Sequence, residues 1–310
     1  MHRSRPVTWV GTWMAHWIAC VATAFVGLVA LQATARAESQ KLIHSERSLY
    51  REVLVYETGN ERCMCFTRRC RIGRQTCLDM RNPDRFIMNY PQMMMSALYL
   101  KPRPQSILIV GLGGGSMPRV LAKLLPEAAV DVVEIDPAVV SVAKKYFAFQ
   151  PSAKVSVIES DGRVYVKKAI REQRHYDLVM LDAFDHEYIP EHLLTQEFLR
   201  EVKALLSPDG VLAANTFSSS RLYDHESVTY ASVFGEFYNL RRDNRVILAT
   251  NGVLPAVSEA ERNSVALQPL LEPFGVHGNR NMELFTTRRD WNDKARLLTD
   301  QYSPANLLNR

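Results

Sequence analysis

A glycine-rich turn that follows a short apolar segment constrains the fold of this chain more than any other feature. Residues 106–116 read Ser-Ile-Leu-Ile-Val-Gly-Leu-Gly-Gly-Gly-Ser, which predicts a buried strand, a tight turn and the start of a helix. Gly111, Gly113 and Gly115 permit the sharp turn and let the backbone come close to a ligand. Because free amide groups open the next helix, the turn suits a polar or anionic group.

Three interpretations of this turn are open on these residues alone. The dinucleotide-binding fingerprint requires glycine at its sixth position, and the chain has Ser116 there. The alternate spacing Gly-x-Gly-x-Gly is similar to the first motif of adenosylmethionine-type transferases. A turn that only connects a strand to a helix is the third interpretation.

Strands and helices alternate along the chain after the turn. The expected strands cover residues 106–110, 130–135, 155–158, 176–181 and 211–217. The expected helices cover residues 117–125, 137–147, 162–172 and 197–206. Such a series predicts an α/β fold, a doubly wound, mostly parallel sheet with helices on both faces, here assigned to residues 104–310. Ligands bind such a Rossmann-like sheet at the carboxyl ends of its strands.

A small N-terminal β domain with a connecting helix is expected before this sheet, over residues 45–100. Its predicted strands cover residues 49–56, 62–67 and 72–78, and a helical stretch is expected over residues 84–100. The segment Lys-Pro-Arg-Pro at 101–104 marks the boundary between the two domains.

Acidic residues follow three of the predicted strands, at the edge where a ligand would bind. Glu134 ends the second strand and can accept hydrogen bonds from both hydroxyls of a ribose. Asp161 precedes the helix that starts at Gly162, where it acts either as a helix cap or as an acceptor for an adenine amino group. Asp182 and Asp185 follow the fourth strand, and two carboxylates there suit the binding and deprotonation of a cationic amine. The alternative for this pair is a solvated acidic loop.

Several segments, taken in order, resemble the spermidine synthase (polyamine aminopropyltransferase) family, in its bacterial spermidine-synthase-like branch. The segments are Gly-Leu-Gly-Gly-Gly-Ser, Val-Glu-Ile-Asp-Pro, Ser-Asp-Gly, Tyr-Asp-Leu-Val-Met-Leu-Asp-Ala-Phe-Asp and Leu-Thr-x-Glu-Phe-Leu. The similarity runs from about Leu49 to Phe217. It includes Gln75, which is similar to the glutamine of the family's hairpin, and Tyr90, which is similar to its site tyrosine.

The resemblance implies an aminopropyltransferase with decarboxylated S-adenosylmethionine as co-substrate, putrescine or a similar polyamine as acceptor, and no metal. In this reading Glu134 holds the ribose, Asp161 the adenine, and Asp182 removes a proton from the amine. The residues assigned to the donor are Gly111, Gly113, Gly115, Glu134, Asp161 and Gly162, and those assigned to the acceptor are Gln75, Tyr90 and Asp185.

Two alternative functions are open, one from a departure from the family and one from the expected export. The family's glycine turn carries an amine-binding aspartate, and Gly114 stands there in this chain. The missing side chain is expected to leave room for a carboxylate, which suits a methyltransferase that uses intact S-adenosylmethionine. A catalytically silent, exported binding protein is the other alternative, because both adenosyl donors are made in the cytosol.

The first 37 residues have the features of a signal peptide or a membrane anchor. A basic start with Arg3 and Arg5 precedes an apolar run over residues 7–31 that contains no Asp, Glu, Lys or Arg. Residues 35–37, Ala-Arg-Ala, fit a cleavage site, and the run is also long enough to stay in a bilayer. The chain is therefore expected to be exported to the periplasm or anchored to the membrane by this segment.

Four cysteines cluster in the predicted β domain, at Cys63, Cys65, Cys70 and Cys77. The other cysteine of the chain, Cys20, lies in the leader. An even, clustered set in an exported chain predicts two disulfides, with zinc binding and free thiols as the alternatives.

Charge excludes one class of partner. The formal charge of the chain is +5, but the leader contributes three arginines and no acid, so residues 38–310 carry only +2. Such a weak charge excludes a polybasic nucleic-acid-binding protein. The expected partner is a small-molecule amine, and the sequence leaves open whether the chain forms a homodimer.

Overall fold

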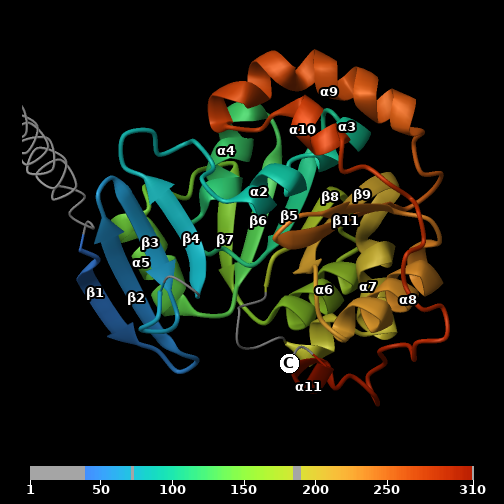
Figure 1. Cartoon of the computed structure of the whole chain (residues 1–310), viewed down its shortest axis with the longest axis horizontal. Helices are drawn as coiled ribbons and strands as arrows, with labels where there is room; N and C mark the ends of the chain where they lie inside the picture. Colours follow the sequence, from blue (N-terminus) through green and yellow to red (C-terminus); the bar gives the residue numbers. More distant parts are fainter. Residues whose placement is uncertain (1–38, 71–72, 184–189, 309–310) are drawn as a thin grey trace, which may run out of the picture. The chain divides into compact units, whose positions relative to one another are not determined.

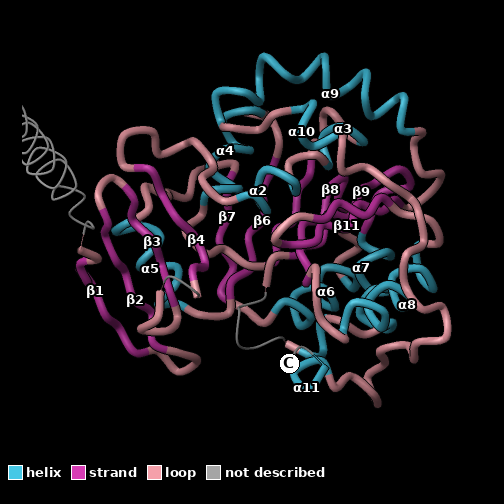
Figure 2. Tube along the Cα trace, in the orientation of Figure 1, coloured by secondary structure: helices cyan, strands magenta, loops and turns pink. Residues whose placement is uncertain are grey.

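A computed structural model describes residues 39–70, 73–183 and 190–308 of the chain (Figures 1 and 2). Gln40–Arg310 form one compact unit, and its described part contains two sheets, of four and seven strands. The expected leader and Asp185 lie outside the described residues. Among the helices of the described part, none is both long and apolar enough to cross a membrane.

The larger sheet is mostly parallel, as the alternation of strands and helices predicts. Its order, within the described residues, is β10-β11-β9-β8-β5-β6-β7. The strands are β5 (Ser106–Val110), β6 (Ala129–Glu134), β7 (Val155–Glu159), β8 (Tyr176–Leu181), β9 (Leu206–Phe217), β10 (Tyr238–Arg241) and β11 (Asn244–Thr250). Strands β5 to β9 pair in parallel, whereas β11 is antiparallel to both β9 and β10. This topology confirms the expected α/β, Rossmann-like fold.

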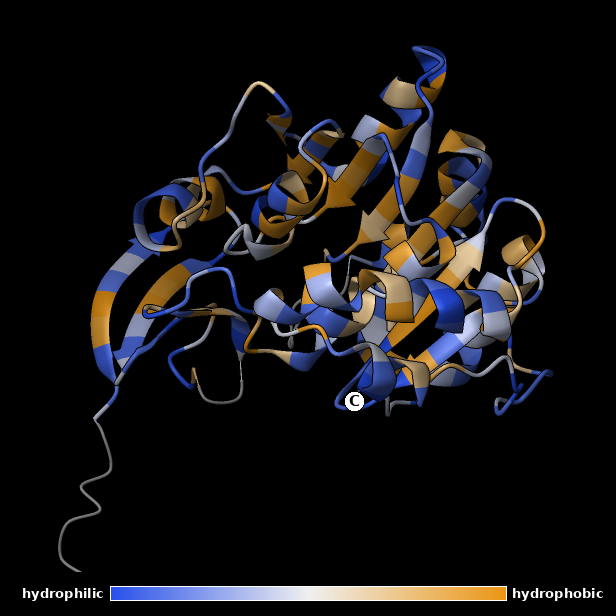
Figure 3. Cartoon of the chain, turned by 90° about the horizontal axis from the view of Figure 1, so that it is seen from above, coloured by the Kyte–Doolittle hydropathy of each residue, from blue (hydrophilic) through white to orange (hydrophobic). Residues whose placement is uncertain are grey.

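Apolar side chains on both sides of the parallel strands explain why helices cover both faces. In β5, Ile107 and Ile109 belong to one core cluster, and Leu108 and Val110 belong to another, because successive side chains point to opposite faces. The first cluster includes residues of α3 (Ala97–Leu100), α4 (Ser116–Leu124), α5 (Pro137–Tyr146) and α9 (Val257–Leu271). The second includes residues of α6 (Gly162–Arg171), α7 (Gln196–Leu205) and α8 (Leu222–Phe234). Figure 3 shows the strands of the sheet as predominantly hydrophobic between these helices.

The smaller sheet is antiparallel and lies beside α5 (Figure 1). Its strands, in sheet order, are β1 (Lys41–Arg47), β2 (Glu52–Thr58), β3 (Glu61–Cys65) and β4 (Arg74–Asp79). Val55 of β2 and Met64 of β3 form a core cluster with Val139 and Val142 of α5. Strand β1 is not among the predicted strands, which begin at Leu49.

Disulfides join β3 to β4 and to the segment between them. Cys63 is bonded to Cys77, directly opposite in the register of the two strands, and Cys65 is bonded to Cys70. All four side chains are buried. The prediction of two disulfides is therefore confirmed in the described part of the chain, and the zinc alternative is not.

The helical stretch expected over residues 84–100 is wrong in its first part. Phe86 forms a bridge with Leu78, and its amide donates to the carbonyl of Phe274. Helical structure begins only at α2 (Asn89–Met94), which a turn separates from α3. Backbone pairing with distant segments therefore holds residues 84–88 in a non-helical conformation, which a local pattern does not reveal.

A second correction concerns the start of the strand expected over residues 211–217. Strand β9 starts at Leu206, and its register against β8 changes from Tyr176↔Leu206 to Leu178↔Val211. Residues 207–210, which precede the expected strand, therefore form a bulge inside a longer strand. After β9 the chain continues through α8, β10, β11, α9, α10 (Gly278–Met282) and α11 (Ala305–Leu308), none of which is predicted from the sequence.

Candidate active site

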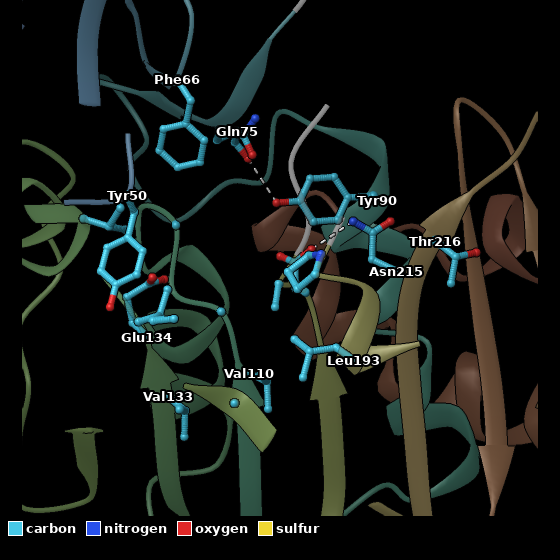
Figure 4. Close-up of a pocket in the computed structure, with 18 of the residues that line it drawn as sticks. Tyr50, Phe66, Gln75, Tyr90, Val110, Val133, Glu134, Leu193, Asn215 and Thr216 are labelled. Carbon is cyan, nitrogen blue, oxygen red and sulfur yellow. Dashed lines mark hydrogen bonds between the residues drawn. The ribbon is translucent and has the colours of Figure 1, made fainter. Parts of the chain in front are cut away.

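The acids expected at three strand ends line a single pocket (Figure 4). The pocket has a volume of about 600 Å³ and lies at the carboxyl ends of the parallel strands. Glu134 ends β6, Asp161 follows β7 and Asp182 follows β8 directly. Phe66, which follows β3, lies on the side of the pocket away from Val110 and Val133, and Tyr50, from the connection between β1 and β2, lies beside Glu134. The prediction that these acids meet at one edge of the sheet is therefore confirmed.

The glycines of the turn have different structural roles. Gly111 has a φ of +102°, and a Cβ atom there would lie 2.2 Å from the carbonyl oxygen of Asp182. The ends of β5 and β8 therefore approach so closely that only glycine fits. Gly113 has a φ of +52° and lines the pocket. Gly115 has a left-handed conformation at the start of α4 and packs against Phe149, so its role is in the packing of the turn.

Backbone amides fix the carboxylate of Glu134. Its Oε2 accepts from the amide of Leu112 at 2.9 Å, and its Oε1 accepts from the amide of Asp136 at 3.0 Å. Burial raises the pKa of Glu134, although these two hydrogen bonds counteract the increase. Each oxygen keeps a further lone pair, so the carboxylate can accept hydrogen bonds from vicinal hydroxyls. Asp136, whose side chain accepts from the amide of Ala138, caps α5.

Asp161 is both a helix cap and a pocket residue. Its Oδ1 accepts from the amides of Arg163 and Val164 at the start of α6, and its Oδ2 lies 2.8 Å from Nε2 of His192. Burial raises the pKa of Asp161, but the hydrogen bonds from Val164 and His192 outweigh it and lower the pKa overall. Gly162, the next residue, also lines the pocket. The helix-cap interpretation is thus confirmed, and the residue still faces the ligand space.

Asp182 is the pocket acid with the most perturbed titration. Burial raises its pKa to about 7, and the negative charge of Glu134 adds to this increase. Hydrogen bonds from Asn215 and Tyr90 act in the opposite direction, and Asn215 Nδ2 donates to Asp182 Oδ1 at 2.9 Å. The carboxylate can therefore exchange a proton near neutral pH, which is the property of a general base.

Gln75 and Tyr90 lie next to each other in the pocket (Figure 4). The hydroxyl of Tyr90 has two acceptors within reach, the backbone carbonyl of Gln75 at 3.2 Å and the carboxylate of Asp182, and its one proton is available to either of them. Burial raises the pKa of Tyr90 well above its ordinary value, and the charge of Asp182 raises it further. The hydroxyl therefore stays protonated and serves as a hydrogen-bond donor. Two of the three residues assigned to the acceptor, Gln75 and Tyr90, thus line the pocket, and the third, Asp185, lies outside the described residues.

Gly114 does not open space for a ligand carboxylate, contrary to the expectation. A Cβ atom at this position would lie 2.7 Å from Cγ2 of Thr76 and 3.0 Å from Cδ1 of Phe147. Both of these side chains are buried. The volume that a larger side chain would occupy is therefore filled by the protein itself, and Gly114 gives no support to a carboxylate-bearing donor.

Further polar residues of the pocket are absent from the sequence-based set. Asn215 and Thr216 lie near the end of β9, where the strand-end rule that selected the acids also applies to amides and hydroxyls. His192 and Asn244 reach the pocket from segments that carry no recognisable motif. Within the described residues, no group of three or more His, Cys, Asp or Glu side chains is arranged to hold a metal ion.

Comparison with known sequences identifies one family. The family model for the spermine/spermidine synthase domain matches residues 87–244. A polyamine aminopropyltransferase of Vibrio vulnificus (strain CMCP6) is 49% identical over 273 residues, which cover 86% of this chain and 91% of the relative.

Solved structures are similar to this fold. A spermidine synthase in complex with the transition state analogue AdoDATO has a TM-score of 0.58 and 16% sequence identity, and the match covers 80% of this chain and 85% of that chain. Human methyltransferase-like protein 13 in complex with SAH has a TM-score of 0.51 and 26% sequence identity, and the match covers 68% of this chain and 98% of that chain. Because the spermidine synthase structure is only 16% identical in sequence, its similarity concerns the fold alone.

Proposed function

Because this chain belongs to the spermine/spermidine synthase family, we propose that it moves an aminopropyl group from decarboxylated S-adenosylmethionine to an amine such as putrescine. The observation that carries the proposal is the presence of Glu134 and Asp182 in one pocket. Glu134 is fixed by two amides and can accept the hydroxyls of a ribose, while Asp182 is buried and titrates near neutrality. Binding of a nucleoside donor requires the first property, and deprotonation of an amine acceptor requires the second.

In the proposed reaction, the amine nitrogen attacks the carbon next to the sulfonium of the donor. A nitrogen–carbon bond forms, the sulfur–carbon bond breaks, methylthioadenosine leaves, and one proton passes from the nitrogen to Asp182. An alkylammonium group has a pKa of about 10.4, far above that of an ordinary aspartate. Burial raises the pKa of Asp182 to about 7 and so narrows this gap. Proton transfer is therefore easier to Asp182 than to an exposed carboxylate.

The test combines donor binding and turnover in three proteins. The unaltered protein is expected to bind decarboxylated S-adenosylmethionine in calorimetry and to release methylthioadenosine when putrescine is added. Asp182→Asn is expected to lose about 10²–10⁴-fold in turnover with donor affinity little changed, since the amide cannot accept the proton. Glu134→Gln is expected mainly to weaken donor binding. Full turnover in Asp182→Asn would exclude this residue as the base.

Methyl transfer from intact S-adenosylmethionine is the second candidate. The similarity to human methyltransferase-like protein 13, solved with SAH, favours it. Tighter binding of intact than of decarboxylated S-adenosylmethionine would support methyl transfer over aminopropyl transfer. Binding of neither donor would support an exported binding protein instead.

We also propose that the protein works outside the cytosol, in the periplasm or at the membrane. The clustered disulfides support this location, because such bonds persist in oxidising compartments. Fractionation of cells that express the full chain with a C-terminal tag is expected to find it in the periplasmic or membrane fraction. A variant without residues 1–37 is the control, and equal cytosolic recovery of both proteins would contradict the proposal.

A further inference from the structure

Two asparagine side chains connect Asp182 to the antiparallel edge of the larger sheet. Asn215 Nδ2 donates to Asp182 Oδ1 at 2.9 Å, and Asn244 Nδ2 donates to Asn215 Oδ1 at 3.1 Å. Asn215 lies on β9 and Asn244 starts β11, the neighbouring strand. In the register, Asn215 is opposite Val246, two residues from Asn244, so the two amides are diagonal neighbours on one face. Figure 4 shows Asn215 pointing into the pocket.

We propose that Asn215 is a positioning residue for the carboxylate of Asp182 and that Asn244 determines which end of the Asn215 amide faces this carboxylate. The role in catalysis rests on the proposed function, but the orientation of the amide does not. This arrangement, here called the amide relay, consists of Asp182, Asn215 and Asn244.

The physical basis of the amide relay is the near symmetry of an asparagine side chain. Its oxygen and its NH₂ group have almost the same shape, so a rotation by 180° exchanges a donor for an acceptor. An oxygen turned toward Asp182 would repel the carboxylate. The donor from Asn244 binds the Asn215 oxygen and so disfavours this rotation. Asn215 is only 8% exposed, which limits the water available to replace a lost partner.

The amide relay counteracts the burial of Asp182. Burial and the charge of Glu134 favour the protonated acid, whereas the hydrogen bonds from Asn215 and Tyr90 favour the carboxylate. The other ionisable side chains that line the pocket in the described residues are Tyr50, Arg51, Arg74, Asp161, His192 and Asp243. Without the Asn215 donor, Asp182 should bind its proton more tightly, so the base should become available only at higher pH.

The experiment measures the titration of Asp182 directly and compares it with turnover. Aspartate labelled with ¹³C at the carboxyl carbon is followed by NMR as the pH is varied, and Asp182→Asn assigns the signal. Asn215→Ala removes the donor to Asp182, and Asn244→Ala removes the donor to Asn215. Neither change adds a charge near Asp182. Asn263→Ala is the control, because it removes an amide with a hydrogen bond to the Tyr99 carbonyl, outside the pocket.

In both relay variants, Asp182 is expected to titrate about one pH unit higher than in the unaltered protein. In Asn263→Ala, its titration is expected to be unchanged. With Asp182 half ionised near pH 7, such a change would reduce the ionised fraction about fivefold at that pH. The rising limb of kcat/KM should move by the same amount, and raising the pH should restore turnover.

An unchanged titration of Asp182 in both variants would overturn the proposal. If Asn215→Ala does not fold, Asn244→Ala alone decides, because it leaves Asn215 in place and introduces no charge. Absence of aminopropyl transfer in the unaltered protein would remove the proposed function, while the NMR titration would still support or refute the amide relay. A loss of turnover that higher pH does not restore would also count against the relay.

Discussion

Asp182 lies where several strands end, and each neighbour acts on it in a different way. Gly111 has no side chain, which lets the backbone of Asp182 pack closely against it, since a Cβ atom there would collide with the Asp182 carbonyl. Asn215 and Tyr90 stabilise its charged form, whereas burial and Glu134 stabilise its protonated form. Because these effects oppose one another, replacing any of these neighbours should shift the pKa of Asp182 in a known direction.

The pH dependence of turnover should report on this balance. Burial raises the pKa of Asp182 to about 7, and a base must be ionised to act. The profile of kcat/KM is therefore expected to rise with pH and to reach half of its plateau near pH 7. Glu134→Gln removes a negative charge that raises this pKa, so its half-maximal point should lie at lower pH. A flat profile between pH 6 and 8 would contradict the assignment of Asp182 as the base.

Substitution of Gly111 should damage both the fold and the site. In Gly111→Ala, the added Cβ atom would lie 2.2 Å from the Asp182 carbonyl oxygen, and φ is +102°. Gly235→Ala is a matched control, since φ there is +77° and no atom lies within 4 Å of the added Cβ. The control should cost about 1 kcal/mol from backbone strain alone, and Gly111→Ala clearly more. Urea unfolding measures the difference, and equal losses in the two variants would show that the contact with Asp182 is unimportant.

At the scale of elements, α8 carries an acid that the pocket does not use. Glu226 is buried between this helix and β11, and neither of its carboxyl oxygens has a hydrogen-bond partner among the described residues. Burial raises its pKa to about 8, although the charge of Arg245 acts against the increase. Arg245 instead donates to Asn239 and Ser227. Ionisation of Glu226 should therefore destabilise the folded protein, because it places a buried charge without a hydrogen-bond partner.

Glu226→Gln should stabilise the protein in alkaline but not in acidic solution. The folded protein holds the Glu226 proton up to about pH 8, whereas the unfolded chain releases it near pH 4.5. The free energy of unfolding of the unaltered protein should therefore decrease as the pH rises between these values, and the variant lacks this decrease. The difference should be small at pH 5 and on the order of a few kcal/mol at pH 8. Glu236→Gln, an exposed position, is the control, and parallel pH dependences would contradict the prediction.

The sequence predicts the parallel half of the larger sheet better than its antiparallel edge, for a physical reason. Buried parallel strands such as β5 and β8 are short apolar runs between helices, and acids such as Glu134 and Asp182 directly mark their ends. Strands β10 and β11 follow α8 and carry no such repeat, so the sequence does not mark Asn244 as a site residue. Asn215 lies on a strand that the sequence predicts, but an uncharged amide at a strand end indicates a site less clearly than a carboxylate does.

At the scale of the whole molecule, the smaller sheet provides one wall of the pocket. Gln75 lies on β4, and Phe66 directly follows β3, where the guanidinium of Arg51 lies 4.3 Å from the centre of its ring. Disulfides join these same strands. The integrity of the ligand site is therefore coupled to the oxidation of a sheet outside the Rossmann-like domain.

The four clustered cysteines are expected to be oxidised in the mature protein. Alkylation before reduction should label none of Cys63, Cys65, Cys70 and Cys77 in peptide mapping by mass spectrometry, and alkylation after reduction should label all four. Each bridge should contribute roughly 2–3 kcal/mol to stability, so reduction should lower the melting temperature. Replacement of both members of a pair by serine identifies the contribution of each bridge. Bound zinc with four reduced thiols would contradict this prediction and the proposed location together.

The disulfide between Cys63 and Cys77 also bears on the entropy of ligand binding. Gln75 is two residues from Cys77, on a strand that the bond holds in register with β3. A pocket wall that is ordered before the ligand arrives does not have to be ordered by the ligand, and preorganisation of this kind increases affinity without any additional contact. Formation of this disulfide therefore reduces the conformational entropy that the pocket wall loses when a ligand binds.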